Sequence, residues 1–226
     1  HALMQEGVAF HDLALVIVDE QHRFGVQQRL ALRDKGPAHG HVPHQLVMTA
    51  TPIPRTLAMT AYADLDVSAI DELPPGRTPV QTVAVSAERR PELVERIRAA
   101  CAEGRQAYWV CTLIEEPEDE GEPGQGMKLQ AQAAERTFAQ LSEQLPGVRV
   151  GLVHGRIKAA EKQATMRAFK DGALDLLVAT TVIEVGVDVP NASLMIIENA
   201  ERLGLAQLHQ LRGRVGRGAA ASSCVL

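Results

Sequence analysis

Short apolar runs alternate with helix-like stretches along the chain, at the spacing typical of α/β proteins. The run Ala14–Val18 is apolar throughout, and it predicts a strand that is buried on both faces of a parallel sheet. A shorter run, Gln45–Met48, predicts a second strand, and the stretches Gln27–Lys35 and Pro54–Tyr62 are helix-like. This first part of the chain therefore supplies only two or three strands.

The segment Leu73–Gly76 (LPPG) interrupts the alternation and predicts a linker. Beyond it the pattern restarts, with strands expected near 80–85, 107–113, 148–153, 175–179 and 193–198 and helices near 88–103, 129–145 and 158–171. We therefore predict an α/β protein with two parallel-sheet units, an incomplete one over residues 1–76 and a second over residues 77–226.

The composition is that of an ordinary globular protein, with 46% hydrophobic and 23% charged residues. No apolar run approaches the roughly 20 residues that span a bilayer, and the N-terminal residues lack the pattern of a secretion signal. The cysteines Cys101, Cys111 and Cys224 form no Cys-x-x-Cys pair, which argues against a disulfide framework or a zinc knuckle. We expect a cytoplasmic protein with no membrane partner.

One segment accounts for the net charge of −5: residues 115–122 (EEPEDEGE) contain six acids and no bases. Without it, 23 basic residues face 22 acidic ones, so a local basic track for nucleic acid remains possible. The surrounding stretch, residues 115–127, is predicted to be a solvated loop without regular structure. Aromatic residues make up only 3%, which argues against recognition of bases by stacking.

Two carboxylates follow the first predicted strand directly. Asp19 and Glu20 would lie at its carboxyl end, which is where open α/β sheets bind ligands. In nucleotide hydrolysis such a pair divides the work: Asp19 would hold Mg²⁺, and Glu20 would orient and deprotonate the attacking water. The alternative is that the strand simply ends in two solvated acids.

The second predicted strand is followed by Thr-Ala-Thr-Pro. The hydroxyls of Thr49 and Thr51 could bond to the acids of the first strand and respond to their state. Taken alone, this sequence is equally that of an ordinary turn.

Regularly spaced arginines occur near the C-terminus, in QLRGRVGRG. Arg214 and Arg217 are three residues apart and would project the same way on a helical turn, while the glycines allow close backbone approach. A guanidinium placed against a γ-phosphate stabilises the transition state of phosphoryl transfer. The alternative is a basic surface loop or a nucleic-acid patch.

The imidazoles of His39, His41 and His44 are close enough in sequence to suggest a Zn²⁺ or Ni²⁺ site. No cysteine lies nearby and the segment resembles a loop, so we favour solvated histidines. Tyr108 and Trp109 lie in a buried-strand pattern and are predicted to be core residues.

Four of these stretches, in this order, resemble motifs two, three, five and six of the superfamily-two helicases and translocases: DEQH (19–22), TAT (49–51), ATTVIEVGVD (179–188) and QLRGRVGR (210–217). Within the superfamily the chain is most similar to the RecG family of bacterial ATP-dependent DNA helicases, through DEQHRFGVQQR, MTATPIPRTLAMT, DELPPGRTP, QAYWVCTLIEE and VGLVHGRIK. The resemblance covers nearly the whole chain apart from the acidic stretch. The nearest alternative is the transcription-repair coupling translocase, whose second motif has Glu where Gln21 stands.

The resemblance implies two RecA-like lobes, the first incomplete, and the hydrolysis of ATP with Mg²⁺. It implies that His22, with Thr49 and Thr51, couples the nucleotide state to DNA. Further site residues are implied for the second lobe: Gly186 and Asp188 at the cleft between the lobes, and Gln210, Arg214 and Arg217 facing the γ-phosphate.

The expected macromolecular partner is branched double-stranded DNA, at replication forks and recombination junctions. The turn His154-Gly155-Arg156 precedes a predicted helix, and its backbone N–H groups could hold a DNA phosphate at the helix N-terminus. Thr180 resembles the fifth-motif residue that touches the DNA backbone. The alternative for this turn is simply a loop without a ligand.

No G-x-x-x-x-G-K-[ST] phosphate loop occurs in the 226 residues. In the family this loop lies in an upstream part of the first lobe, and a wedge domain precedes it, so we expect the chain to be a motor fragment that relies on both. A rival hypothesis is that the chain by itself is a non-catalytic lobe.

Overall fold

The computed structural model describes residues 3, 5, 7–20, 35, 42–49, 66–75, 77–112, 125–181, 189–218 and 220–226. The chain forms two compact units, His1–Val67 and Ser68–Leu226, so the division falls shortly before the boundary expected at residue 76. The expected linker lies in a stretch, residues 66–80, whose described residues form neither helix nor strand. In the described part of the chain, no helix combines the length and the apolar character needed to cross a membrane.

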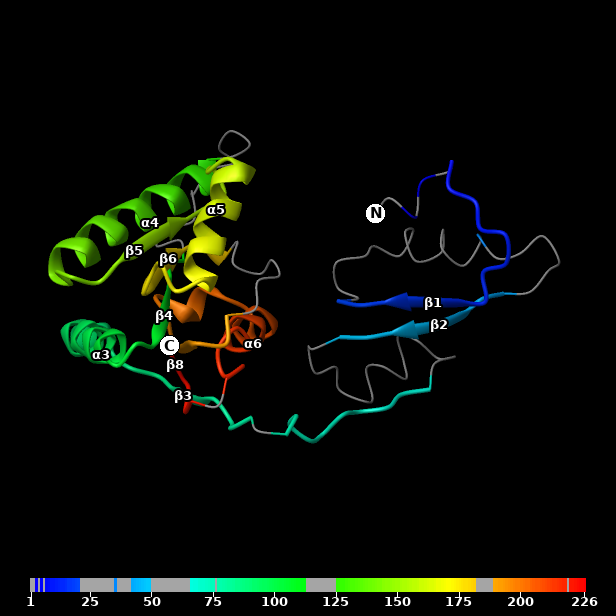
Figure 1. Ribbon diagram of the computed structural model, residues 1–226, viewed down its shortest axis with the longest axis horizontal. Coiled ribbons are helices and arrows are strands. Elements are labelled where there is room, and N and C mark those ends of the chain that lie inside the picture. Colours follow the sequence, from blue (N-terminus) through cyan, green and yellow to red (C-terminus); the bar gives the residue numbers. More distant parts are fainter. Residues whose placement is uncertain are drawn as a thin grey trace. The chain divides into compact units, whose positions relative to one another are not determined.

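The first unit contains two parallel strands, β1 (Leu15–Val18) and β2 (His44–Val47), which lie side by side (Figure 1). Both strands were predicted, but burial of β1 on both faces was not correct. Val16 and Val18 are buried, whereas Leu15 and Ile17 are 53% and 57% exposed. Successive side chains of a strand point to opposite faces, and only the valine face of β1 is covered. The predicted helices 27–35 and 54–62 fall outside the described residues, apart from Lys35.

The second unit is built on a six-stranded parallel sheet (Figure 1). Its strands are β3 (Gln81–Val83), β4 (Gln106–Val110), β5 (Val150–Val153), β6 (Leu176–Ala179), β7 (Ala192–Ile197) and β8 (Ser223–Val225), in the order β3-β8-β7-β4-β6-β5. The five strands predicted from the sequence are confirmed. The short strand β8, inserted between β3 and β7, was not predicted.

The helices of this unit are α3 (Arg90–Ala102), α4 (Gln125–Gln144), α5 (Ala159–Lys170) and α6 (Leu205–Arg212). A 3-10 turn, η3 (Ala87–Arg89), leads into α3: the Ser86 hydroxyl accepts the Glu88 N–H at 3.4 Å, and Pro91 stands in the first turn of α3. A second such turn, η5 (Ala200–Arg202), follows β7. The three predicted helices are confirmed, and α6 was missed.

The helix α4 begins earlier than predicted. Residues 125–127 were assigned to the acidic loop, but they form the first turn of α4. The rest of the predicted loop, residues 115–124, lies outside the described residues.

The core of the second unit lies on both faces of the sheet, and β4 contributes to both. Tyr108 and Trp109 are fully buried, as predicted, and face opposite sides because they are adjacent in a strand. Tyr108 packs with Phe169 of α5 and Leu211 of α6, and its ring meets the Phe169 ring edge-on at 5.0 Å between centroids. Trp109 packs with residues of α3 and α4. The unit is therefore a three-layer α/β/α structure.

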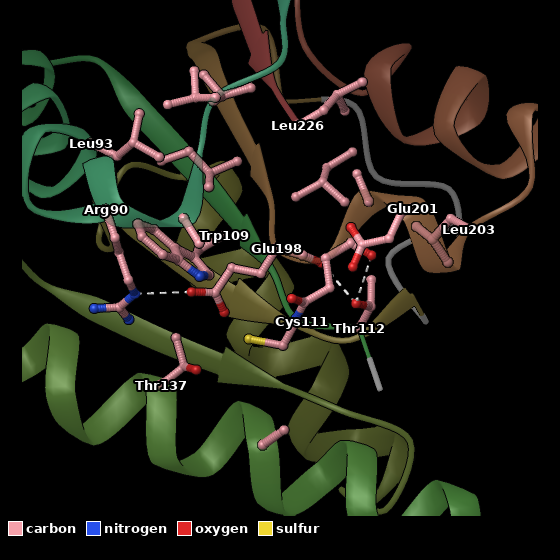
Figure 2. Close-up of a pocket in the computed structure, with 18 of the residues that line it drawn as sticks. Arg90, Leu93, Trp109, Cys111, Thr112, Thr137, Glu198, Glu201, Leu203 and Leu226 are labelled. Carbon is pink, nitrogen blue, oxygen red and sulfur yellow. Dashed lines mark hydrogen bonds and ion pairs between the residues drawn. The ribbon is translucent and has the colours of Figure 1, made fainter. Parts of the chain in front are cut away.

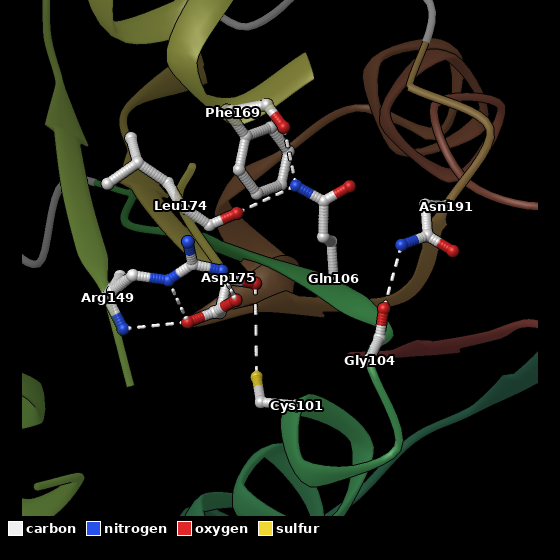
Figure 3. Close-up of polar contacts among 8 residues, drawn as sticks. All are labelled: Cys101, Gly104, Gln106, Arg149, Phe169, Leu174, Asp175 and Asn191. Atoms are coloured by element: carbon white, nitrogen blue, oxygen red, sulfur yellow. Dashed lines mark hydrogen bonds and ion pairs between the residues drawn. The ribbon is translucent and has the colours of Figure 1, made fainter. Parts of the chain in front are cut away.

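In the second unit, polar contacts hold the strands and turns together at the amino ends of the strands (Figure 3). The functional motifs lie at the opposite, carboxyl ends. The buried Gln106 donates from Nε2 to the carbonyl oxygen of Leu174 at 2.7 Å. Arg149 donates from Nε to Asp175 Oδ2 at 3.0 Å, and these hydrogen bonds lower the pKa of the Asp175 carboxyl. Burial raises the pKa of the nearby Cys101 thiol to about 11, so this thiol stays protonated at neutral pH.

Candidate functional site

The two acids of the second motif occupy a turn at the carboxyl end of β1. Asp19 is exposed, and its Oδ1 accepts the N–H of Glu20 at 2.8 Å. Glu20 adopts a left-handed backbone conformation, with φ of 54°. This conformation is unusual for a residue with a Cβ and is enriched at functional sites. The backbone geometry therefore supports a special role for this turn.

Thr49 lies at the same edge of the first unit as these acids. The strands β1 and β2 are parallel with Val18 paired to Val47, and the N–H of Met48 donates to the carbonyl oxygen of Val18 at 2.8 Å. Thr49 follows Met48 and is exposed. Carboxylate and hydroxyl oxygens are the donors that Mg²⁺ prefers, so the residues present here fit an ATP-bound magnesium ion. The other residues expected at this edge, His22 and Thr51, lie outside the described residues.

The arginines of the sixth motif do not share a helical turn, contrary to prediction. Gln210 lies in α6, but this helix ends at Arg212 with Gly213 as its C-cap. Gly216, between the two arginines, has φ of 77° and takes the chain out of helical geometry. Arg217 folds back, and its Nε donates to the carbonyl oxygen of Gly213 at 3.1 Å. Helical spacing therefore does not describe how Arg214 and Arg217 project.

Gly216 of this motif and Gly218 directly after it are required by close packing, as predicted. A Cβ on Gly216 would lie 2.5 Å from Cγ2 of Val80, and one on Gly218 would lie 2.4 Å from the carbonyl oxygen of Pro190. Pro190 is two residues beyond Asp188 in the sequence. The packing of Gly218 on Pro190 thus brings the end of the sixth motif against the segment that follows the fifth. Gly186 and Asp188 themselves lie outside the described residues.

The turn His154-Gly155-Arg156 follows β5 and is held by side chains on both sides. His154 is buried, and its Nε2 lies 3.3 Å from Oε1 of Glu135 in α4. The ammonium group of Lys162 in α5 donates to the Gly155 carbonyl oxygen at 2.9 Å. The turn precedes a helix, as predicted, because α5 begins at Ala159.

Thr180 directly follows β6 and lies next to this turn. The strands β5 and β6 are paired neighbours, and the N–H of Thr180 donates to the Val153 carbonyl oxygen at 3.2 Å. The Thr180 side chain is buried, and its hydroxyl has no hydrogen-bond partner among the described residues. A buried hydroxyl without a partner is costly.

A cavity of about 1020 Å³ opens at the carboxyl ends of β4 and β7, and the sequence did not reveal it (Figure 2). Arg90 donates from Nε to Glu198 Oε1 at 3.0 Å, and its guanidinium carbon lies 4.9 Å from the centre of the Trp109 ring. The Thr112 hydroxyl donates to the Glu198 carbonyl oxygen at 2.7 Å. Burial raises the pKa of the Cys111 thiol to about 12. Arg90 and Glu198 are 108 residues apart, so only the fold could reveal this pair.

The family description "Helicase conserved C-terminal domain" matches residues 92–219, which is more than half of the chain. The chain belongs to this helicase family. The matched range contains the turn at His154, Thr180 and the whole of the sixth motif.

Over its entire length the chain is similar to proteins named ATP-dependent DNA helicase RecG. It is 71% identical to the one from Escherichia coli strain K12, 70% identical to the one from Haemophilus influenzae and 52% identical to the one from Mycobacterium bovis. In each case the whole chain is covered, but only 32%, 32% and 31% of the relative. The chain thus spans about a third of the length of these relatives. Their names favour RecG over the coupling translocase.

A comparison with solved structures also shows similarity to RecG. "Structure of RecG bound to three-way DNA junction" matches with a TM-score of 0.71 and 46% identity, over 100% of this chain and 27% of that one. The Mycobacterium smegmatis helicase Lhr, bound to ssDNA and AMP-PNP, matches with a TM-score of 0.63 over 94% of this chain and 28% of that one. At 19% identity, the second match supports the fold alone. The predicted α/β class with parallel sheets and the predicted resemblance to RecG are confirmed.

Proposed function

We propose that the chain works in an ATP-dependent helicase that remodels branched double-stranded DNA, such as replication forks and recombination junctions. One observation carries this proposal: Asp19, Glu20 and Thr49 lie at the shared carboxyl edge of two parallel strands, in a chain that is similar to RecG throughout. For such a DNA-acting enzyme in bacteria, we propose a cytoplasmic location.

In the first unit, we assign Asp19 to holding the magnesium ion that accompanies ATP, and Glu20 to the attacking water. Bound Mg²⁺ would neutralise charge on the phosphates. The Glu20 carboxylate would orient the water and accept its proton as the oxygen attacks the γ-phosphorus. The hydroxyls of Thr49 and Thr51, together with His22, would transmit the state of the nucleotide to DNA.

The second unit would contribute the positive charge needed in the transition state. Arg214 and Arg217 would donate to the γ-phosphate oxygens, with Gln210 beside them, and Gly186 and Asp188 would border the nucleotide. An arginine in this role contributes about 10³- to 10⁵-fold in rate. The close contact of Gly218 with Pro190 supports this assignment because it fixes the backbone just beyond Arg217.

We assign contact with the DNA backbone to the ends of β5 and β6. The turn His154-Gly155-Arg156 would present the exposed Arg156 side chain and the Gly155 N–H to a phosphate, since the Arg156 N–H already donates to His154 Nδ1. Thr180 would use its buried hydroxyl, which lacks a partner in the described part of the chain, as a donor to the same strand.

A chimera tests the proposal: the matching residues of the Escherichia coli RecG relative are replaced by this chain. We expect ATP hydrolysis that is stimulated by a three-way DNA junction. Glu20→Gln should lower kcat by about 10²- to 10⁴-fold, because it removes the base but keeps the shape. Asp12→Asn, which removes an exposed acid elsewhere in the first unit, should leave kcat unchanged. A folded chimera whose hydrolysis survives Glu20→Gln would contradict the assignment.

A further inference from the structure

The His154 ring makes two polar contacts that differ in kind. Its Nδ1 accepts the backbone N–H of Arg156 at 3.3 Å, and its Nε2 lies 3.3 Å from Oε1 of Glu135. The first contact lies within the proposed phosphate-binding turn, whereas the second joins the turn to α4. The ring therefore links a helix side chain to one particular backbone amide.

The first contact determines where the ring hydrogen lies. A nitrogen that accepts a hydrogen bond carries no hydrogen, so the ring hydrogen must be on Nε2. The Nε2 atom, which carries that hydrogen, lies 3.3 Å from Oε1 of Glu135, and a carboxylate is an acceptor only. Nδ1 thus faces a donor, the Arg156 N–H, and Nε2 faces an acceptor, the Glu135 carboxylate. Glu135 therefore stabilises the tautomer in which Nδ1 can accept.

The two side chains of this contact differ in exposure. The His154 side chain is 8% exposed, whereas that of Glu135 is 53% exposed. A buried ring that loses its acceptor on Nε2 would be left with an unsatisfied N–H, which favours another tautomer or rotation of the ring. Either change would release the Arg156 amide.

We infer that Glu135 is a positioning residue for DNA binding: acting through the His154 ring, it holds the Arg156 backbone in place, so that the exposed Arg156 side chain is presented to the DNA phosphate. This inference rests on the proposed function of the turn. Lys162 supports the turn from α5 through the Gly155 carbonyl, so the turn is held from two helices.

Three variants in α4 test the inference in the 226-residue chain. Glu135→Ala removes the acceptor, Glu135→Gln keeps a side-chain oxygen that can accept from Nε2–H, and Glu143→Ala removes another exposed acid of the same helix as a control. Long-range ¹H–¹⁵N spectra report the tautomer of His154, and the amide resonance of Arg156 reports the turn. Fluorescence anisotropy with a labelled 20-base-pair duplex reports DNA affinity.

We expect Glu135→Ala to disturb the Nε2–H tautomer, shift the Arg156 amide resonance and weaken DNA binding by about fivefold, the effect of losing one hydrogen bond. Glu135→Gln should restore the tautomer and bring the affinity to within about twofold of that of the parent chain. Glu143→Ala should change none of these readouts.

An Ala variant that keeps the parent tautomer and Arg156 resonance would overturn the inference, as would a Gln variant that behaves like the Ala variant. Failure of the proposed function would look different. If Arg156→Glu, which places a negative charge at the turn, left duplex affinity unchanged, the turn would not be the DNA site, while the two spectra would still decide whether Glu135 positions it.

Discussion

The backbone of Gly218 lies directly against the carbonyl oxygen of Pro190, with no room for a side chain between them. Gly218 directly follows Arg217, the last residue of the sixth motif. This contact therefore fixes the end of the sixth motif against the residues that follow the fifth motif. The close approach is a packing requirement, and a single methyl group tests it.

Gly218→Ala should destabilise the chain by about 1–3 kcal/mol, the usual cost of overpacking against a backbone atom. Urea unfolding followed by circular dichroism measures this cost. Gly213→Ala is the matched control, since a Cβ there meets only ordinary contacts, the nearest at 3.4 Å, and φ is −67°. Equal stabilities of the two variants would show that the contact with Pro190 is not tight.

Arg217→Ala in the chimera should lower kcat for ATP by about 10³- to 10⁵-fold while DNA affinity changes little. The reason is that a guanidinium at the γ-phosphate acts in the transition state and not in the binding of DNA. Arg202→Ala, which removes an exposed arginine elsewhere in the second unit, is the control. If DNA affinity collapsed and turnover per bound complex survived, Arg217 would be a DNA-phosphate contact.

The 226-residue chain alone should show negligible ATP turnover, with or without junction DNA. It contains no G-x-x-x-x-G-K-[ST] loop to hold the β- and γ-phosphates, whatever its other site residues do. Steady-state hydrolysis of the chain beside that of the chimera measures the difference. Turnover equal to that of the chimera would show that this chain binds the phosphates by other means.

Replacing residues 116–124 by a short Gly-Ser link should leave the melting temperature unchanged to within about 2 °C. This stretch has no hydrophobic residue that could be buried to offset the entropy of ordering it. A full-length version with its acids changed to Gln separates the effect of charge from that of length. A fall of many degrees on replacement would assign the stretch a structural role.

Asp175→Asn should cost about 1 kcal/mol of stability at neutral pH, because Arg149 loses a charged acceptor. The pKa of Asp175 is lowered by this hydrogen bonding, so its contribution is present above the unfolded pKa of about 4 and is lost as the pH falls further. Urea unfolding at pH 7 and at pH 3 measures this dependence. If the difference in the free energy of unfolding between the parent and the variant were as large at pH 3 as at pH 7, the pair of Arg149 and Asp175 would not be the source of that difference.

The pattern of hydrophobic residues alone was sufficient to predict the elements whose residues are buried throughout. Every residue of β4 is buried, and its apolar run was recognised as a core strand, with Tyr108 and Trp109 as core residues. The strand β8 has three residues, too few for a period to emerge. The helix α6 was missed because its apolar positions do not form one buried face: Leu211 is buried, but Leu205 is 86% exposed.

The sequence correctly placed residues whose position follows from the end of a strand, and it misplaced residues whose position depends on backbone shape. The acids after β1 were found because a strand end is visible in the sequence. The spacing of Arg214 and Arg217 was misinterpreted because Gly213 ends the helix and Gly216 adopts a positive φ. The contacts of His154 with Glu135 and of Arg90 with Glu198 join distant segments, so no local pattern contains them.

Unwinding of a fluorescently labelled three-way DNA junction by the chimera tests the central claim most directly. We predict ATP-dependent strand separation at a rate comparable to that of the Escherichia coli relative, and its loss in the Glu20→Gln and Arg217→Ala variants while junction binding persists. A folded chimera that binds the junction and hydrolyses ATP but separates no strands, or that separates them equally well with both variants, would contradict the account.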